Sequence, residues 1–134
     1  MPDNIPTSPC IVGIGTDLTE VARIKKLMDD HGDSFLKKVF TAAEIEYCKA
    51  RPAPEIHYAA RFAAKEAVAK VLGTGFDSRV SLSGISVEKD ELGAPYVVLN
   101  DAAKSRLEEI GAQKILLSIT HTKELAQAFA LASK

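Results

Sequence analysis

The fold is decided by one stretch of sequence, residues 55–72, which reads EIHYAARFAAKEAVAKVL. It contains neither glycine nor proline, and Pro54 just before it has the backbone φ that a first helical position requires. Gly73 follows it, and glycine is a common residue at the end of a helix. The pattern therefore predicts one long helix from about Glu55 to Leu72.

The charged residues in the middle of this predicted helix fall on two stripes. Glu66 and Lys70 lie one turn apart on the first stripe, and Arg61 and Lys65 lie one turn apart on the second. Two like charges at this spacing cost about 0.3 kcal/mol in an isolated helix, so Arg61 and Lys65 indicate an anion nearby. The alternative is a surface ion pair between Glu66 and Lys70, with the other two cations extended to solvent. The helix alone leaves both interpretations open.

A short apolar run with two glycines begins the predicted domain. Cys10–Gly15 is typical of a strand, and the apolar residues after Asp17 recur at helical spacing, which predicts strand, turn and helix. Asp17 is expected to cap that helix, and a cap does not exclude a ligand role. The Gly-x-Gly pattern lacks the third glycine of a dinucleotide-binding loop, because position 18 is Leu.

Two more helical segments are predicted before the long helix. Gly32 ends the first helix, and residues 35–40 form a short helical turn. Thr41 and Glu44 have the spacing of a capping box, which starts a helix that continues to about Lys49.

The second half of the chain predicts a mostly antiparallel sheet. The expected elements are the hairpin strands Ile85–Glu88 and Tyr96–Leu99, a helix from Asn100 or Asp101 to Ile110, and the strand Ile115–Ile119. The last segment, Leu125–Ala132, has the alanine content of a helix. A strand and a short turn precede it, and these favour a returning strand, which we predict.

These segments together predict an α+β fold. Residues 10–134 form one domain in which the long central helix packs on a mostly antiparallel sheet. Residues 1–9 contain three prolines and are expected to be a flexible leader.

The composition excludes several functional classes. Seventeen Lys and Arg balance eighteen Asp and Glu, so no overall field attracts nucleic acid or an anionic membrane. No apolar run approaches the roughly 20 residues that cross a bilayer, and no signal peptide begins the chain, so a cytoplasmic location is expected. Cys10 and Cys48 fit no disulfide or metal-binding pattern and are expected to be free thiols.

Two groups of polar residues leave their roles open. Residues 118–122, SITHT, end a predicted strand in hydroxyls and an imidazole, a set able to bind phosphate or to make structural hydrogen bonds. A basic stretch consists of Arg23, Lys25, Lys26, Lys37 and Lys38. This stretch is either a solvated helix face or a docking surface for an acidic protein.

Three motifs, taken in their order along the chain, resemble the holo-acyl-carrier-protein synthase family. They are residues 13–17 (GIGTD), residues 61–67 (RFAAKEA) followed by Lys70 and residues 73–75 (GTG), and residues 118–121 (SITH). The resemblance implies a 4′-phosphopantetheinyl transferase fold. It also implies transfer of phosphopantetheine from coenzyme A to a serine of acyl carrier protein, with release of adenosine 3′,5′-bisphosphate. A homotrimer with active sites at its subunit interfaces is implied as well.

The same resemblance implies the catalytic residues. Asp17 and Glu66 match the family's metal ligands, and two carboxylates with a pyrophosphate oxygen suit Mg²⁺, which keeps several waters. Lys70, the third expected catalytic residue, matches the group that reaches the pyrophosphate and protonates the departing phosphate. The general base for the attacking serine stays open between a metal-bound water, Asp17 and a group on the carrier protein.

The remaining implied roles concern binding. Arg61, His121 and Thr122, together with Lys70, are expected to hold the phosphates of coenzyme A. A contact with the acidic helix of acyl carrier protein is expected for Arg23, with Lys26 one turn further along.

A second interpretation comes from a different class of protein, a non-catalytic oligomeric module that binds an acidic partner through residues 23–38. Under either interpretation the apolar side of the long helix and the last two strands are too broadly apolar for one small domain to cover. Part of this surface is therefore expected to contact another subunit.

Overall fold

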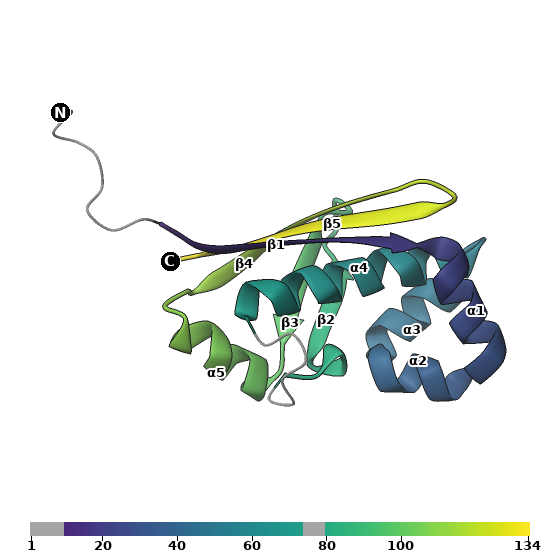
Figure 1. Cartoon of the computed structure of the whole chain (residues 1–134), viewed down its shortest axis with the longest axis horizontal. Helices are drawn as coiled ribbons and strands as arrows, with labels where there is room; N and C mark the ends of the chain where they lie inside the picture. Colours follow the sequence, from purple (N-terminus) through teal and green to yellow (C-terminus); the bar gives the residue numbers. More distant parts are fainter. Residues whose placement is uncertain (1–9, 74–79) are drawn as a thin grey trace, which may run out of the picture.

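The computed structural model describes residues 10–73 and 80–134, so the predicted leader and positions 74 and 75 of the GTG motif lie outside the described residues. Figure 1 shows the long helix α4 running beneath three strands, with α1, α2 and α3 near one end and α5 near the other. The elements in chain order are β1 Ile11–Glu20, α1 Val21–His31, α2 Asp33–Val39, α3 Ala42–Lys49, α4 Pro54–Leu72, the 3₁₀ turn η1 Leu82–Gly84, β2 Ile85–Lys89, β3 Pro95–Leu99, α5 Asp101–Glu109, β4 Lys114–His121 and β5 Leu125–Ser133.

The observed topology confirms the predicted α+β fold. One sheet has the strand order β1-β5-β4, a second sheet pairs β2 with β3, and every pair is antiparallel. The long helix, the hairpin and the returning last strand are all present. Within the described ranges, every helix is too short or too polar to span a bilayer.

Side-chain caps begin two of the helices as predicted. The Thr41 hydroxyl accepts a hydrogen bond from the Glu44 amide, and the Glu44 carboxylate accepts one from the Thr41 amide. The Asn100 side chain accepts a hydrogen bond from the amide of Ala103 and so caps α5. Cys10 and Cys48 are both free thiols, the first exposed and the second buried, as expected.

The predicted turn at residues 16–17 is wrong, because β1 continues through these residues to Glu20. Asp17 pairs with Ala128 of β5 in the middle of the ladder, so it does not cap a helix. Helix α1 begins at Val21, and its N-cap Glu20 makes no side-chain cap hydrogen bond.

Gly15, which was predicted to lie beside a turn, is instead required by the close packing of β1 on α4. A Cβ atom on Gly15 would lie 2.1 Å from the backbone oxygen of Ala67 in α4. The residues of β5 that are buried toward α4 alternate as small side chains: Ala126, Ala128, Ala130 and Ala132. Because these residues are small, β1 and β5 approach the helix closely and carry Asp17 with them.

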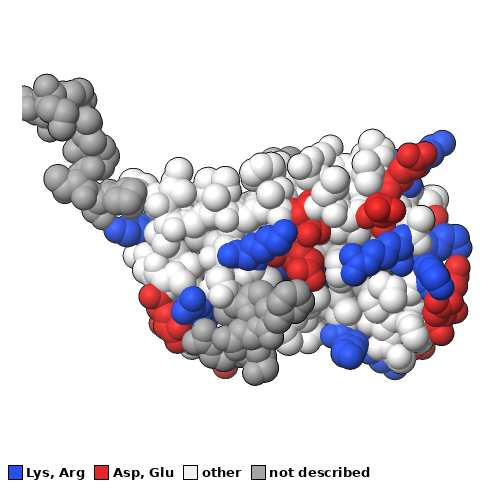
Figure 2. All heavy atoms as spheres, viewed as in Figure 1, with Lys and Arg blue, Asp and Glu red and all other residues white. Residues whose placement is uncertain are grey.

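The exposed apolar surface lies on the sheet and not on the long helix. The prediction that the apolar side of the long helix needs another subunit to cover it is therefore wrong. Helix α4 is covered by its own chain, and Val68, Val71 and Leu72 are all buried. The outer face of the three-stranded sheet is open instead, with Ile14 63%, Leu116 53% and Phe129 47% exposed. Figure 2 shows few charged side chains along most of the edge where these strands run.

Candidate active site

Lys70 joins the middle of β1 to α4. Its ammonium group donates a hydrogen bond of 2.8 Å to the backbone oxygen of Thr16 and lies 3.6 Å from a carboxylate oxygen of Asp17. The other Asp17 oxygen accepts a hydrogen bond of 2.7 Å from the Thr19 hydroxyl. Two of the three predicted catalytic residues are therefore brought into direct contact.

Glu66, the third predicted catalytic residue, lies close enough to the first two to feel their charges. Burial raises the pKa of Glu66, and the negative charge of Asp17 raises it further. The charges of Lys70 and Arg23 act in the opposite direction and lower this pKa. The site thus holds two carboxylates that repel each other, with two cations beside them.

This donor set fits Mg²⁺. Two carboxylates that repel each other favour a small hard cation such as Mg²⁺, which takes oxygen ligands and keeps several of its waters. Across residues 10–73 and 80–134, no three His, Cys, Asp or Glu side chains gather as a metal cage. A metal held by two carboxylates would keep coordination positions for water and for substrate oxygens.

Arg61 lies in a cationic cluster that sequence reasoning missed. Its guanidinium carbon is 4.0 Å from the ring centroid of Tyr47, and the guanidinium carbon of Arg51 is 4.1 Å from the same ring. The Lys89 ammonium is 5.5 Å from that centroid. We call Tyr47, Arg51, Arg61 and Lys89 the Tyr47 cluster; all four line a pocket of about 430 Å³.

Three cations lie close to the Tyr47 ring and change the pKa of its hydroxyl. Burial by itself would raise the pKa of the Tyr47 hydroxyl, but a hydrogen bond from Lys89 and the charges of Lys89, Arg51 and Arg61 lower it overall. The lowered pKa reflects the three cations beside the Tyr47 ring. Glu88, Asp90 and Glu91 line the same pocket, so an anionic group would be attracted to the cations at the ring and not to the pocket as a whole.

His121 extends this region from the end of β4. Its ring centroid lies 5.8 Å from that of His57 on α4, which in turn lies 6.0 Å from the Tyr47 ring. Burial lowers the pKa of His57, as do the charges of His121 and Arg61. The Thr122 hydroxyl lies in the β4–β5 turn and accepts hydrogen bonds from the amides of Glu124 and Leu125.

Lys65 does not belong to this site, so the anion that Arg61 and Lys65 indicated is in part internal. The Lys65 ammonium is fully buried, 2.6 Å from a carboxylate oxygen of Glu44. Its charge is balanced inside the core, whereas Arg61 turns toward the pocket.

The basic stretch divides into one residue near the site and others on a solvated helix face. The guanidinium carbon of Arg23 lies 5.8 Å from the ring centroid of Phe62, and its charge lowers the pKa of Glu66. Lys26 pairs with Asp30 at 2.7 Å, and Lys25 pairs with Asp29 in the same way. Arg23 therefore stands at the edge of the carboxylate pair, and the charge of Lys26 is locally balanced.

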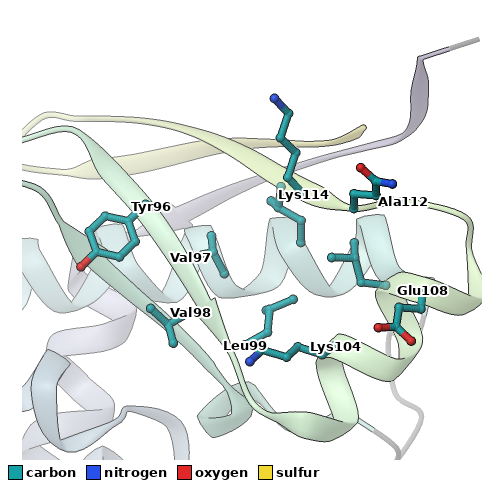
Figure 3. Close-up of a pocket in the computed structure, with 11 residues that line it drawn as sticks. Tyr96, Val97, Val98, Leu99, Lys104, Glu108, Ala112 and Lys114 are labelled. Carbon is teal, nitrogen blue, oxygen red and sulfur yellow. The ribbon is translucent and has the colours of Figure 1, made fainter. Parts of the chain in front are cut away.

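A second cavity, of about 610 Å³, is lined mainly by apolar residues and lies away from these groups. Figure 3 shows residues of β3, α5, β4 and the connection between α5 and β4 around it, including Val97, Leu99 and Ala112. None of the predicted site residues lines this cavity.

Comparison with known proteins identifies the class. The model of the 4′-phosphopantetheinyl transferase superfamily matches residues 13–131. A holo-[acyl-carrier-protein] synthase from Ruminiclostridium cellulolyticum is 46% identical over 121 residues, which cover 90% of each chain.

Solved structures agree with these matches. The crystal structure of holo-[acyl-carrier-protein] synthase from Neisseria meningitidis is 36% identical, with a TM-score of 0.85 over 92% of this chain and 99% of that one. The Helicobacter pylori enzyme in complex with coenzyme A is 29% identical, with a TM-score of 0.79 over 90% of this chain and 99% of that one. The chain therefore belongs to the holo-[acyl-carrier-protein] synthase family of the 4′-phosphopantetheinyl transferases, and it is an enzyme. The non-catalytic module is set aside.

Proposed function

We propose that the protein transfers 4′-phosphopantetheine from coenzyme A to a serine of apo-acyl carrier protein, with Mg²⁺, and releases adenosine 3′,5′-bisphosphate. The observation that carries this proposal is the contact of Asp17 with Lys70 where β1 crosses α4, with Glu66 close enough for both charges to shift its pKa. The relatives are named for the synthesis of holo-acyl carrier protein, and the Helicobacter pylori relative binds coenzyme A.

The proposed reaction is a phosphoryl transfer. The serine oxygen forms a bond to the phosphorus that carries pantetheine, and the serine proton passes to a base. The bond from that phosphorus to the bridging oxygen breaks, and its electron pair leaves with the 5′-phosphate of the nucleotide. Lys70, held beside Asp17, neutralises the departing phosphate and supplies its proton. Bound Mg²⁺, held by Asp17 and Glu66, would neutralise charge on the pyrophosphate.

The Tyr47 cluster supports the assignment of Arg61 to coenzyme A. Arg61, with His121 and Thr122, is proposed to hold the phosphates of coenzyme A, as Lys70 does at the other end of the site. A buried arginine that shares the Tyr47 ring with two further cations favours an anionic ligand. These further cations, Arg51 and Lys89, were not predicted from the sequence.

A calorimetric titration tests the metal assignment. Coenzyme A should bind more tightly with Mg²⁺ than with EDTA, because the metal neutralises repulsion between the two carboxylates and the pyrophosphate. Equal binding under the two conditions would contradict a metal held by Asp17 and Glu66.

Docking of acyl carrier protein is proposed to involve Arg23, with Lys26 as a weaker contact because Asp30 balances its charge. Arg23→Glu should raise KM for apo-acyl carrier protein by at least about tenfold and leave KM for coenzyme A within about twofold. Steady-state kinetics at saturating Mg²⁺ measures both values, since Arg23 also acts on Glu66. Lys104→Glu, an equal charge change on the exposed face of α5, is the control. Equal increases in both KM values would contradict the docking role.

We further propose a homotrimer whose active sites lie at subunit interfaces, in which the open outer face of the sheet supplies the contact. Activity per subunit should fall on dilution at the concentration where the oligomer dissociates, as measured by sedimentation equilibrium and activity in one series. Phe129→Lys should move both transitions to higher concentration, because it places a charge in the apolar face. Leu92→Lys changes an apolar residue that is 95% exposed on the hairpin turn and should move neither. A fully active monomer would contradict the interfacial site.

A further inference from the structure

One carboxylate in the core links three elements. Glu44 of α3 accepts hydrogen bonds from the amides of Thr41 and Val87, each at 2.9 Å, and forms the ion pair with Lys65 of α4. Val87 belongs to β2, so a single side chain ties together α3, β2 and α4.

The ammonium group of Lys65 is as fully used as the carboxylate. It pairs with Glu44 and also donates hydrogen bonds to the backbone oxygens of Leu82, at 2.9 Å, and Ile85. These three contacts account for its three donor hydrogens. A buried ion pair of this kind is seldom more stabilising than an apolar pair of equal volume, so stability alone does not explain it.

The three linked elements carry three of the four residues of the Tyr47 cluster, and the fourth, Arg51, lies between α3 and α4. Tyr47 lies three residues after Glu44 on α3, and Arg61 lies four residues before Lys65 on α4, so each is about one turn away. Lys89 lies two residues after Val87 on β2, on the same side of the strand. The relative placement of Tyr47, Arg61 and Lys89 therefore depends on the contact between Glu44 and Lys65, which lie about one helical turn from the first two.

Arg61 depends on this placement more than an ion-paired arginine would. Its Nε atom is buried and has no hydrogen-bond partner among the described residues. The ring of Tyr47 covers its guanidinium group at 4.0 Å. A shift of α3 against α4 would move the ring and leave the guanidinium without its support.

We propose that the Glu44–Lys65 ion pair is a positioning device for the anion-binding end of the active site. It locks α3 and β2 against α4, so that Tyr47 and Lys89 hold Arg61 in the direction of the incoming phosphate. The inference rests on the proposed role of Arg61 in binding coenzyme A. Glu44 and Lys65 are positioning residues, because they act through Tyr47 and Arg61 and touch no substrate.

The test is a double variant, Lys65→Met with Glu44→Gln, which removes both charges and keeps an acceptor at the capping-box position. We expect its thermal unfolding midpoint to fall, because one of the Thr41 and Val87 amides loses its acceptor and the backbone oxygens of Leu82 and Ile85 lose their donor. KM for coenzyme A should rise about tenfold, the scale at which a loosened supporting shell weakens a site. KM for apo-acyl carrier protein should change less than about twofold.

Two further variants separate positioning from general stability. Leu107→Ala opens a cavity in the core beneath α5, far from the cluster, and should lower the unfolding midpoint without raising KM for coenzyme A. Tyr47→Leu, which leaves the ion pair intact, should raise KM for coenzyme A about as much as the double variant. Added to the double variant, it should raise KM little further, because both changes act through the same ring.

The outcomes distinguish this inference from the proposed function. A folded double variant with the KM of the wild type, or an equal rise in Leu107→Ala, would overturn the positioning role. If the double variant does not fold, an unchanged KM in Tyr47→Leu overturns it. A wild-type protein that does not bind coenzyme A in calorimetry would contradict the proposed function instead.

Discussion

Glu66→Gln is expected to lower the rate of phosphopantetheine transfer by roughly a thousandfold while the protein remains folded. The substitution removes one of two carboxylates without changing side-chain volume. Loss of several kcal/mol of charge stabilisation, at about 1.4 kcal/mol per tenfold, gives an effect of this size. Transfer is measured as formation of holo-acyl carrier protein over a range of Mg²⁺ concentrations.

Stability provides an independent readout for the same variant. Burial and the charge of Asp17 raise the pKa of Glu66, so the folded protein holds this proton more tightly than the unfolded chain does. The contribution of Glu66 to stability therefore declines as the pH rises through the raised pKa. In EDTA at neutral pH, Glu66→Gln should unfold at a temperature no lower than the wild type.

The control for this prediction is Glu46→Gln, the same chemical change on an exposed position of α3. It should retain wild-type transfer. Full activity in Glu66→Gln would reject Glu66 as a metal ligand, and an unfolded variant would reject the account of its pKa.

Gly15→Ala is expected to have the largest effect on the fold, about 3 kcal/mol of lost stability. The new Cβ would lie 2.1 Å from the backbone oxygen of Ala67, and neither strand nor helix backbone yields easily. Separation of β1 from α4 also moves Asp17 away from Glu66 and Lys70, so transfer should fall with stability. Urea unfolding and the transfer rate measure the two effects.

Gly13→Ala is a matched control in the same strand. Its Cβ would lie 3.5 Å from the nearest atom, the backbone oxygen of Val71, which is ordinary van der Waals contact. We expect a change of less than about 0.5 kcal/mol. Similar losses in the two variants would show that the close approach at Gly15 is not what determines the effect.

The boundaries of α4 and the start of α3 could be predicted from the sequence, whereas the role of Gly15 could not. Pro54 and Gly73 bracket the long helix, and Thr41 with Glu44 marks the start of α3, because capping is local and can be predicted from neighbouring residues. Gly15 was associated with a turn because a turn and a close approach between two backbones both favour glycine. Only the three-dimensional structure shows that α4 lies over Gly15.

The candidate site was predicted in part for the same reason. Arg61 and Lys65 indicated the need for an anion, but the spacing carried no information about its source, which for Lys65 is Glu44. Tyr47, Arg51 and Lys89 come from separate segments and show no shared periodicity. The ordered motifs that resemble the family identified the catalytic set, whereas the Tyr47 cluster required the structure.

The measurement that tests the proposed transfer most directly is the mass of apo-acyl carrier protein after incubation with the enzyme, coenzyme A and Mg²⁺, with a parallel reaction in EDTA. We predict that the carrier protein gains the mass of one phosphopantetheine and that an equal amount of adenosine 3′,5′-bisphosphate appears. Neither product should form in EDTA. A carrier protein that stays unmodified with Mg²⁺, or that is fully modified in EDTA, would contradict metal-dependent transfer by this site.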